Sequence, residues 1–351
     1  MPVVGYVYDP LYLEHGTPGH PESPARLQSI ISHLERSGLL GQMVEVRPRD
    51  ATPADLELVH SHELIARVRE TAEEGGAPTG VAWLDPDTYV VPGSYRAALR
   101  SAGGVLAATD AVLDGEIGSA FCLVRPPGHH ATPIQAMGFC LFNNVAVAAA
   151  HALERRGLER VAIVDFDVHH GNGTQDAFYS NPRVLYVSTH QYPFYPGGGY
   201  WAETGEGEGE GTTVNLPLPR GCGREEYLRA YREVCEPLVR RFRPQLLLVS
   251  AGFDAHLADP LAQMLLDTRG YYEIASLLKA LADELCDGRI VYALEGGYDH
   301  TALAWSVRAC IDTLLGNEFA EDPLGAGPSV PGINIDTVLA AVKRAHGLDN
   351  G

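Results

Sequence analysis

The sequence has no apolar run that approaches the roughly 20 residues needed to span a bilayer. Its first residues also lack the basic region and long apolar stretch of a secretory signal peptide. None of the six cysteines forms a C-x-x-C pair, and Cys122 and Cys310 fall in segments where free cysteine is usually a small buried side chain. We therefore expect a cytoplasmic protein with reduced thiols and no membrane association.

Positive charge is scarce as well. The chain carries 26 Lys and Arg against 45 Asp and Glu, a formal net charge of −19. A nucleic-acid binder would show a basic patch or stripe, so we expect no nucleic-acid partner. The acidic segment 205–211 is most simply a solvated loop, although at the mouth of an active site it would attract amines.

Low-complexity linkers and internal repeats are absent too. A chain of 351 residues that is 45% hydrophobic can bury a large core, and α/β domains of this size are common. We expect one catalytic domain over residues 1–316. Residues 317–351 are expected to form a C-terminal extension, with a short helix at 336–346, that packs on the same domain or contributes to a homo-oligomer.

The most informative segment that is present runs from Asp165 through Asp167 to His169, after an apolar stretch at 160–164 that predicts a buried strand. Alternate side chains of a strand face one side, so these three groups should project together. Two carboxylates and an imidazole are costly to bury unpaired, and a bound divalent metal, zinc first, would satisfy them. The alternative is a polar strand end paired with Arg160 or Arg183.

Three further apolar runs end in polar residues. Strands are predicted at 120–124, 246–253 and 290–294, and they lead into a His129-His130 pair, Asp254 and Tyr298 respectively. Helices are predicted at 24–36, 144–156, 267–285 and 301–315. This alternation predicts an α/β fold with a mostly parallel central sheet flanked by helices. Ligands in such folds sit beyond the carboxyl ends of the strands, where all of these polar groups stand.

Together these motifs resemble those of the zinc-dependent histone deacetylase family, which includes acetylpolyamine amidohydrolases and acetoin-utilisation proteins. The resemblance extends from residues 20–27 to the helix after Tyr298, and residues 169–175 are most similar to the class II branch. It implies a single-domain arginase/deacetylase-like fold with the active site at the C-terminal ends of the strands.

The resemblance also implies the chemistry. It assigns one Zn²⁺ per chain, with Fe²⁺ as the alternative metal, to Asp167, His169 and Asp254. The His129-His130 pair would transfer protons, the second histidine serving as base and acid. Tyr298 would donate its hydroxyl to the oxyanion of a tetrahedral intermediate. The products would be an amine and a short carboxylate, usually acetate.

Supporting residues are implied in the same way. Asp165 would orient His129, and Asn172 would be the partner of His130. A structural K⁺ is suspected at the backbone of Asp165, Asp167 and His169 with the Ser188 side chain. The remaining assignments are an internal-channel arginine, Arg26, and a substrate tunnel formed by Gly138, Phe139, Tyr195 and Leu261.

Other polar residues receive plainer interpretations. His60 and His62 are interpreted as surface or capping groups, because residues two apart do not share a helix face. His170 and Glu295 are interpreted as structural. His256, two residues after Asp254, is a minor candidate for the site.

The predicted function is removal of acetyl or short acyl groups from a small-molecule or peptide acylamine. Leu261 offers an apolar wall where some polyamine-selective relatives place a carboxylate, which favours acyl-lysine. The acidic loop favours the alternative, an acetylpolyamine amidohydrolase. A two-metal ureohydrolase and a non-catalytic binding module are less consistent with the Asp-x-Asp-x-His order, the paired histidines and Tyr298.

Overall fold

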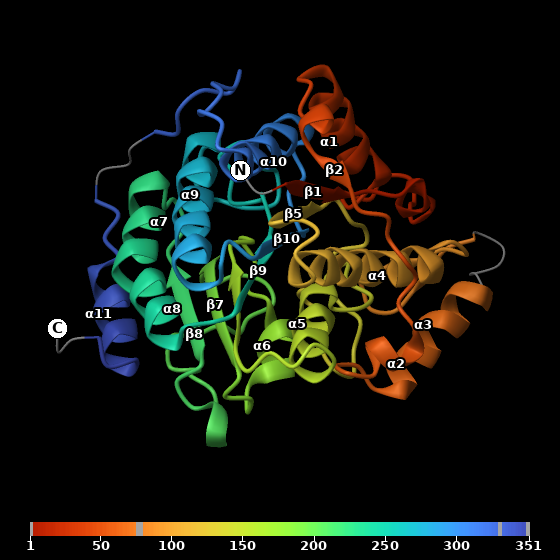
Figure 1. Ribbon diagram of the computed structural model, residues 1–351, viewed down its shortest axis with the longest axis horizontal. Helices are drawn as coiled ribbons and strands as arrows, with labels where there is room; N and C mark the ends of the chain where they lie inside the picture. The colour runs from red at the N-terminus through yellow and green to blue at the C-terminus, as the bar shows by residue number, and fades with distance from the viewer. Residues whose placement is uncertain (1–2, 75–79, 329–331, 349–351) are drawn as a thin grey trace.

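The computed structural model describes residues 3–74, 80–328 and 332–348. Its centre is an eight-stranded sheet in which all the strand pairings are parallel (Figure 1). In spatial order the strands are β2 (Val44–Glu45), β1 (Val4–Val7), β5 (Ser119–Cys122), β10 (Ile290–Leu294), β9 (Leu246–Ala251), β6 (Val161–Asp165), β7 (Val184–Gln191) and β8 (Thr213–Leu218). A separate antiparallel ribbon pairs β3 (Ala82–Trp83) with β4 (Tyr89–Val90).

The four strands predicted from the sequence are β5, β6, β9 and β10, and they form the middle of the sheet in the order β5-β10-β9-β6. Every residue of these strands is buried. A strand covered on both faces needs no polar alternation, which explains their continuous apolar runs. Because neighbouring strands are parallel, their four carboxyl ends meet at one edge.

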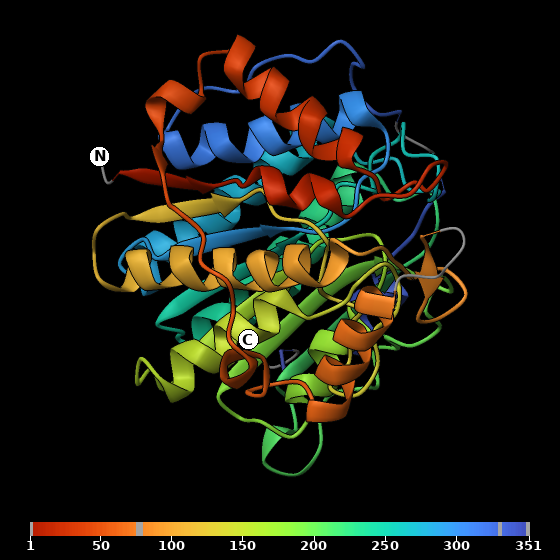
Figure 2. The same cartoon turned by 90° about the vertical axis from the view of Figure 1, so that its right-hand side faces the viewer.

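Helices cover both faces of the sheet, as Figures 1 and 2 show. Helices α1, α9 and α10 pack side by side over one face, and α4 and α5 pack together over the other. The helices are α1 (Pro24–Arg36), α2 (Pro53–Leu56), α3 (His62–Glu74), α4 (Ser94–Leu113), α5 (Asn144–Glu154), α6 (Asn172–Phe178), α7 (Arg224–Ala230), α8 (Glu236–Phe242), α9 (Thr268–Leu285), α10 (His300–Leu315) and α11 (Asp336–Ala345). No helix of the described residues is both long and apolar enough to cross a membrane.

The start of α10 is fixed by its cap. Asp299 accepts hydrogen bonds from the backbone amides of Thr301 and Ala302, as an N-cap aspartate does. The helix ends at Gly316, whose φ of 74° suits glycine. Because Asp299 directly follows Tyr298, this cap also fixes the chain on the C-terminal side of that tyrosine.

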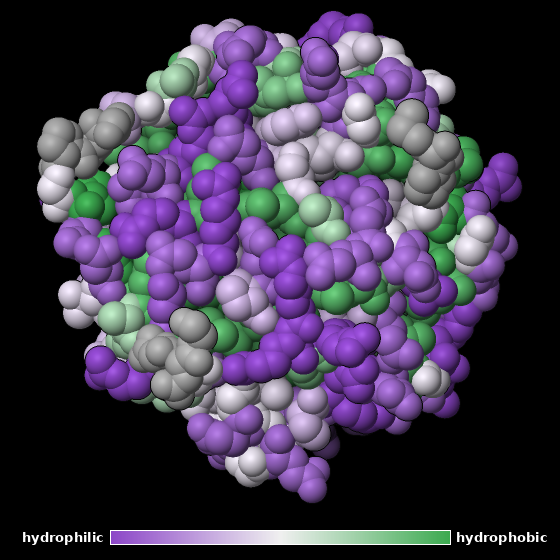
Figure 3. Space-filling view, turned by 60° about the vertical axis from the view of Figure 1, so that its left-hand side comes forward, coloured by the Kyte–Doolittle hydropathy of each residue, from purple (hydrophilic) through white to green (hydrophobic). Residues whose placement is uncertain are grey.

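The C-terminal helix α11 packs beside β8 and buries Leu339 and Val342 in the main hydrophobic core. The Arg241 guanidinium donates to the carbonyl of His346 at the end of this helix. Figure 3, which brings this side forward, shows a largely polar surface with small apolar areas between. The division of the chain at residue 316 and a homo-oligomer stay predictions.

A buried ion cluster joins the N-terminal segment to the sheet. The Glu22 carboxylate pairs with Arg125, which follows β5, and with Arg26 of α1, and all three side chains are fully buried. Arg26 also donates to the carbonyls of Glu295 and Gly297 beyond β10. The cluster therefore ties helix α1 to the edge of the sheet where the polar motifs lie.

Replacing Glu22 by Gln should strongly destabilise the protein, because two buried guanidinium groups lose their counter-charge. We expect the free energy of unfolding to fall by about 3–5 kcal/mol. Glu154→Gln is a matched control, since Glu154 pairs with Arg183 at the exposed surface and should contribute no more than about 1 kcal/mol. Urea denaturation followed by circular dichroism measures both, and equal losses would contradict the role of the cluster.

The same variant should change the acid stability. Burial alone would raise the pKa of Glu22, but Arg125 and Arg26 outweigh it and lower the pKa to about 2. The folded-state pKa is therefore below the unfolded one. The stability that Glu22 contributes should be complete above about pH 4.5 and lost as the pH falls toward 2. Glu22→Gln should show a flatter decline over that range.

Candidate metal centre and active site

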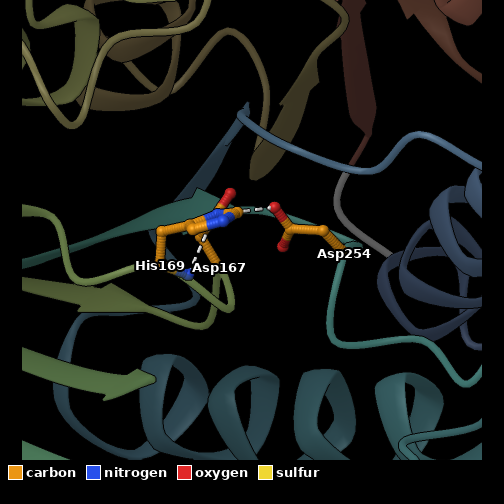
Figure 4. A group of neighbouring side chains, drawn as sticks. All are labelled: Asp167, His169 and Asp254. Atoms are coloured by element: carbon orange, nitrogen blue, oxygen red, sulfur yellow. Dashed lines mark hydrogen bonds and ion pairs between the residues drawn. The ribbon is translucent and has the colours of Figure 1, made fainter. Parts of the chain in front are cut away.

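The three predicted ligands converge on one point. One ligand atom from each of Asp167, His169 and Asp254 lies within 4.8 Å of the others. His169 Nδ1 is 3.1 Å from Asp167 Oδ1 and 3.1 Å from Asp254 Oδ2. Figure 4 shows the three side chains pointing toward one another. Two come from the chain after β6 and the third from the chain after β9.

The local backbone differs from the prediction. Strand β6 ends at Asp165, so Asp167 and His169 lie on an irregular turn and not on an extended strand. Carboxylates hold the turn by accepting hydrogen bonds from backbone amides. The Asp167 amide donates to Asp165 Oδ1, the His169 amide to Asp167 Oδ1 and the Val168 amide to Asp254 Oδ1. As a result Asp167 and His169 meet at the ligand cluster, whereas Asp165 points to His129.

The charges of the cluster suit a cation. Burial and the neighbouring Asp167 raise the pKa of Asp254. Burial would lower the pKa of His169, but Asp167 and Asp254 raise it to about 10, so the cluster attracts a positive charge. A Cβ on Gly252 or Gly296 would overlap the carboxylates, so only glycine leaves room beside them. Carboxylate oxygen and imidazole nitrogen are ligands that zinc accepts, and the residues therefore fit a divalent metal.

The two predicted histidines lie beside this cluster with their predicted partners. His129 Nδ1 is 3.0 Å from Asp165 Oδ2, which also accepts a hydrogen bond from the Tyr186 hydroxyl. His130 Nδ1 donates to Asn172 Oδ1 at 2.8 Å, and the two imidazole rings are 4.0 Å apart.

The two histidines lie in different surroundings, which shift their pKa values in opposite directions. Burial would lower the pKa of His129, but Asp165 and Asp167 raise it to about 10. Burial, with the positive charges of His129 and His169, lowers the pKa of His130 well below its usual value. At neutral pH the first histidine is therefore charged and the second is neutral.

Tyr298 faces the same space. Its ring is 6.0 Å from that of Phe139, and the Arg26 guanidinium lies 5.0 Å from its centroid. Burial raises the pKa of the Tyr298 hydroxyl well above the usual value, so the group keeps its proton. Arg26 belongs to the buried ion cluster, and its proposed part in an internal channel stays a prediction.

A cavity of about 270 Å³ joins these groups. The predicted tunnel residues Gly138, Phe139, Tyr195 and Leu261 all line it, together with His129, His130, Asp167, His169 and Tyr298. Gly138 has a φ of 57°, and a Cβ there would overlap the His130 ring, so this position requires glycine.

Five further residues line the cavity but were not among the predicted site residues: Asp87, Pro127, Cys140, Phe194 and Gly296. The Phe194 ring stacks on His169 at 5.2 Å, and the pair of aromatics at 194–195 after β7 was a usable signal. Asp87 follows Asp85 in the turn between β3 and β4. A single carboxylate in a turn gives no indication of the cavity that it faces.

The plainer interpretations need one correction. His60 is not a surface group, because it is buried between the carbonyl of Thr132 and the amide of Asn143. His62 is exposed, as expected. His170 contacts Gln175, and His256 contacts Thr268, so neither joins the ligand cluster.

Glu295 has a structural role, as predicted, because it binds the backbone beside the histidine pair. Its Oε2 accepts hydrogen bonds from the backbone amides of Gly128 and His129. The carboxylate therefore holds the turn that carries the histidine pair to the end of β10.

Two other predictions concern neighbouring segments. Ser188 lies opposite Asp165 in the β6–β7 pairing, and its hydroxyl is 2.9 Å from His190 Nδ1. A potassium ion there stays a prediction.

The acidic segment 205–211 lies beside residues 179–181 and leads into the first residues of β8. The segment therefore lies at the amino-terminal ends of the strands, whereas the cavity lies beyond their carboxyl ends. It does not border the mouth of the cavity.

Comparison with known proteins identifies the family. Residues 20–314 match the family model described as the histone deacetylase domain. The chain belongs to the histone deacetylase family. It is 43% identical over 354 residues to a probable deacetylase of Archaeoglobus fulgidus, covering 99% of this chain and 96% of that protein. It is 41% identical over 326 residues to the histone deacetylase-like amidohydrolase of Pseudomonas aeruginosa, covering 92% and 83%.

The fold agrees with the family. The crystal structure of the HDA15 HD domain superposes with a TM-score of 0.89 at 36% identity, covering 98% of this chain and 94% of that one. The predicted arginase/deacetylase-like fold is therefore confirmed. Membership of the histone deacetylase family supports deacetylase or amidohydrolase activity, and the matched region contains every residue that lines the cavity.

The ligand cluster predicts one tightly bound metal ion per chain. Asp254→Ala removes one of three ligands and should leave the protein with little metal after dialysis. His256→Gln changes a neighbouring residue that does not face the cluster and should keep the full complement. Mass spectrometry of the dialysed proteins measures both. Two ions in the wild type, or undiminished metal in Asp254→Ala, would contradict the assignment.

Proposed function

We propose that the protein is a zinc-dependent amidohydrolase that removes acetyl or short acyl groups from amines, with acetyl-lysine and similar acylamines as substrates. The observation that carries the proposal is that one cavity is lined by His130, by Tyr298 and by two residues of the ligand cluster. Bound at Asp167, His169 and Asp254, zinc would supply Lewis acidity, which polarises an amide carbonyl and acidifies water.

His130 would move the protons. Its Nδ1 is occupied by Asn172, which leaves Nε2 to accept a proton from water. Its lowered pKa keeps it neutral and ready to act as a base. The same nitrogen would then return the proton to the leaving amine. The positive charge on His129, balanced by Asp165, would stabilise the negative charge that develops on the substrate.

Tyr298 would stabilise the oxyanion. Its hydroxyl stays protonated, so it can donate a hydrogen bond to the carbonyl oxygen as that atom becomes negative. The Arg26 guanidinium beside the ring and the aromatic edge of Phe139 restrict its orientation.

The rival functions fit the geometry less well. A second metal would need further carboxylates, but Asp165 is bonded to His129 and the Tyr186 hydroxyl. A binding module would have no use for a neutral base beside a ligand cluster and a protonated tyrosine. Amide hydrolysis with one metal uses all of these groups.

The cavity favours an acyl-lysine side chain. Leu261, Phe139 and Tyr195 give it apolar walls that suit an aliphatic stem. The acidic loop at 205–211 lies at the far edge of the sheet and supplies no charge to the mouth. Asp87 is the one observation that favours polyamines, because its carboxylate lines the cavity and could pair with a distant ammonium.

Tyr298→Phe should lower kcat by roughly 10²–10³, the loss typical of one oxyanion donor, while metal content stays unchanged. Tyr292→Phe is a matched control on β10, because the buried Tyr292 hydroxyl has no hydrogen-bond partner among the described residues. Steady-state hydrolysis of an acetyl-lysine peptide measures both. A near-normal kcat for Tyr298→Phe would rule out the oxyanion role.

The substrate proposal is tested by comparing kcat/KM for an acetyl-lysine peptide, acetylputrescine and acetylspermidine. We expect the peptide to be preferred, because the walls of the cavity are apolar. A clear preference for the polyamines that is lost at high salt or in Asp87→Asn would show that charge at the mouth decides the choice, against our ranking.

A further inference from the structure

We infer that Asp259 is a positioning residue that sets the place of the catalytic tyrosine and of the tunnel wall together. The inference rests on the proposed function and deepens it. Asp259 Oδ2 accepts a hydrogen bond from the backbone amide of Tyr298 at 2.7 Å, and Oδ1 accepts one from the amide of Leu261 at 2.9 Å. One carboxylate therefore holds two residues of the cavity.

The carboxylate is well placed for this task. Asp259 is 7% exposed, so its bonds to the two amides are shielded from water. Its own amide donates to the carbonyl of His256, which fixes the turn that follows the ligand Asp254. Its two oxygens accept hydrogen bonds from two separate backbone segments, so the side chain fixes these segments relative to each other. Asp259 thus connects the segment after β9 to the segment after β10.

The Tyr298 segment is held at successive residues. The Gly296 amide donates to Asp167 Oδ2 at 2.8 Å, and the Gly297 carbonyl accepts from Arg26 Nε at 2.6 Å. Asp259 holds the next amide, and Asp299 caps α10 immediately afterwards. The glycine pair could otherwise let the loop swing, because Gly297 has a φ of 115°. Asp259 supplies the restraint at the tyrosine itself.

This restraint matters for catalysis because the Tyr298 hydroxyl must meet an oxygen within hydrogen-bond distance. A shift of about 1 Å in a reacting group can cost roughly 100-fold in rate. The Leu261 amide is hydrogen-bonded to the same carboxylate. Asp259 therefore fixes the distance between the tunnel wall that contacts the substrate stem and the tyrosine that donates to the oxyanion.

Asp259→Asn tests the inference, because the side-chain amide has only one acceptor oxygen and loses one of the two bonds. In the zinc-loaded, full-length protein we expect kcat for the acetyl-lysine peptide to fall roughly 10- to 100-fold. KM should change by less than about threefold, and bound metal should be unchanged. Should this variant melt below the assay temperature, Asp259→Ser is carried through the same measurements.

Asp267→Asn is the matched control. Asp267 is also buried and also accepts two backbone amides, from Gly270 at 2.8 Å and Gly327 at 2.9 Å, but it caps α9 and does not line the cavity. If Asp259 has only a general structural role, the two variants should lower kcat equally. We expect Asp267→Asn to keep the wild-type kcat.

A double-mutant cycle shows whether Asp259 acts through Tyr298. In a Tyr298→Phe background, Asp259→Asn should lower the remaining kcat by less than about twofold, because the hydroxyl that it positions is gone. An equal loss in both backgrounds, or wild-type kcat for Asp259→Asn, would overturn the inference while leaving the proposed function intact. A zinc-loaded wild type that hydrolyses none of the acylamines would overturn the proposed function and the inference with it.

Discussion

Two carboxylates buried beside each other, those of Asp167 and Asp254, are the constraint on which the site depends. Among the described residues their ion-pair partners are histidines, without a lysine or arginine within reach. Leaving buried charge uncompensated costs several kcal/mol for each ion, so the cluster needs a cation. The surrounding chain holds the two carboxylates in place. Glycines at 252 and 296 leave room beside them, and the amides of Val168 and Gly296 donate hydrogen bonds to them.

The parallel sheet supplies the geometry. Four neighbouring strands end at one edge, and each brings a different part of the proposed site: the histidine pair after β5, Asp167 and His169 after β6, Asp254 after β9 and Tyr298 after β10. Buried polar residues then link these ends in pairs. Glu295 connects β10 to β5, Asp259 connects the segment after β9 to that after β10, and Arg26 reaches β10 from α1. Each link is a side chain bonded to backbone, which fixes position more strictly than packing alone.

The sequence was sufficient for the fold class, the four central strands and the gathering of polar groups at their carboxyl ends, because apolar runs and strand-end polar groups are local signals. The choice of Asp167, His169 and Asp254 as one cluster came from the family resemblance, and the three side chains do meet. It was wrong about the backbone at Asp167, since a turn held by its own carboxylates looks like a strand in pattern. It also misplaced His60, whose two partners are far away in the chain at Thr132 and Asn143. The cavity position of Asp87 and the hydrogen bond between Asp259 and the Tyr298 amide depend on long-range contacts in the same way. The pattern of apolar and polar residues along the sequence contains no signal for such contacts.

The central claim is that one metal ion at this cluster enables amide hydrolysis, and a zinc titration of the metal-free protein tests it most directly. Acetate release from an acetyl-lysine peptide would be followed as zinc is added. The account predicts no hydrolysis before addition, then a linear rise that stops at about one equivalent per chain. Full activity in the metal-free protein, or a rise that continues to about two equivalents, would contradict it.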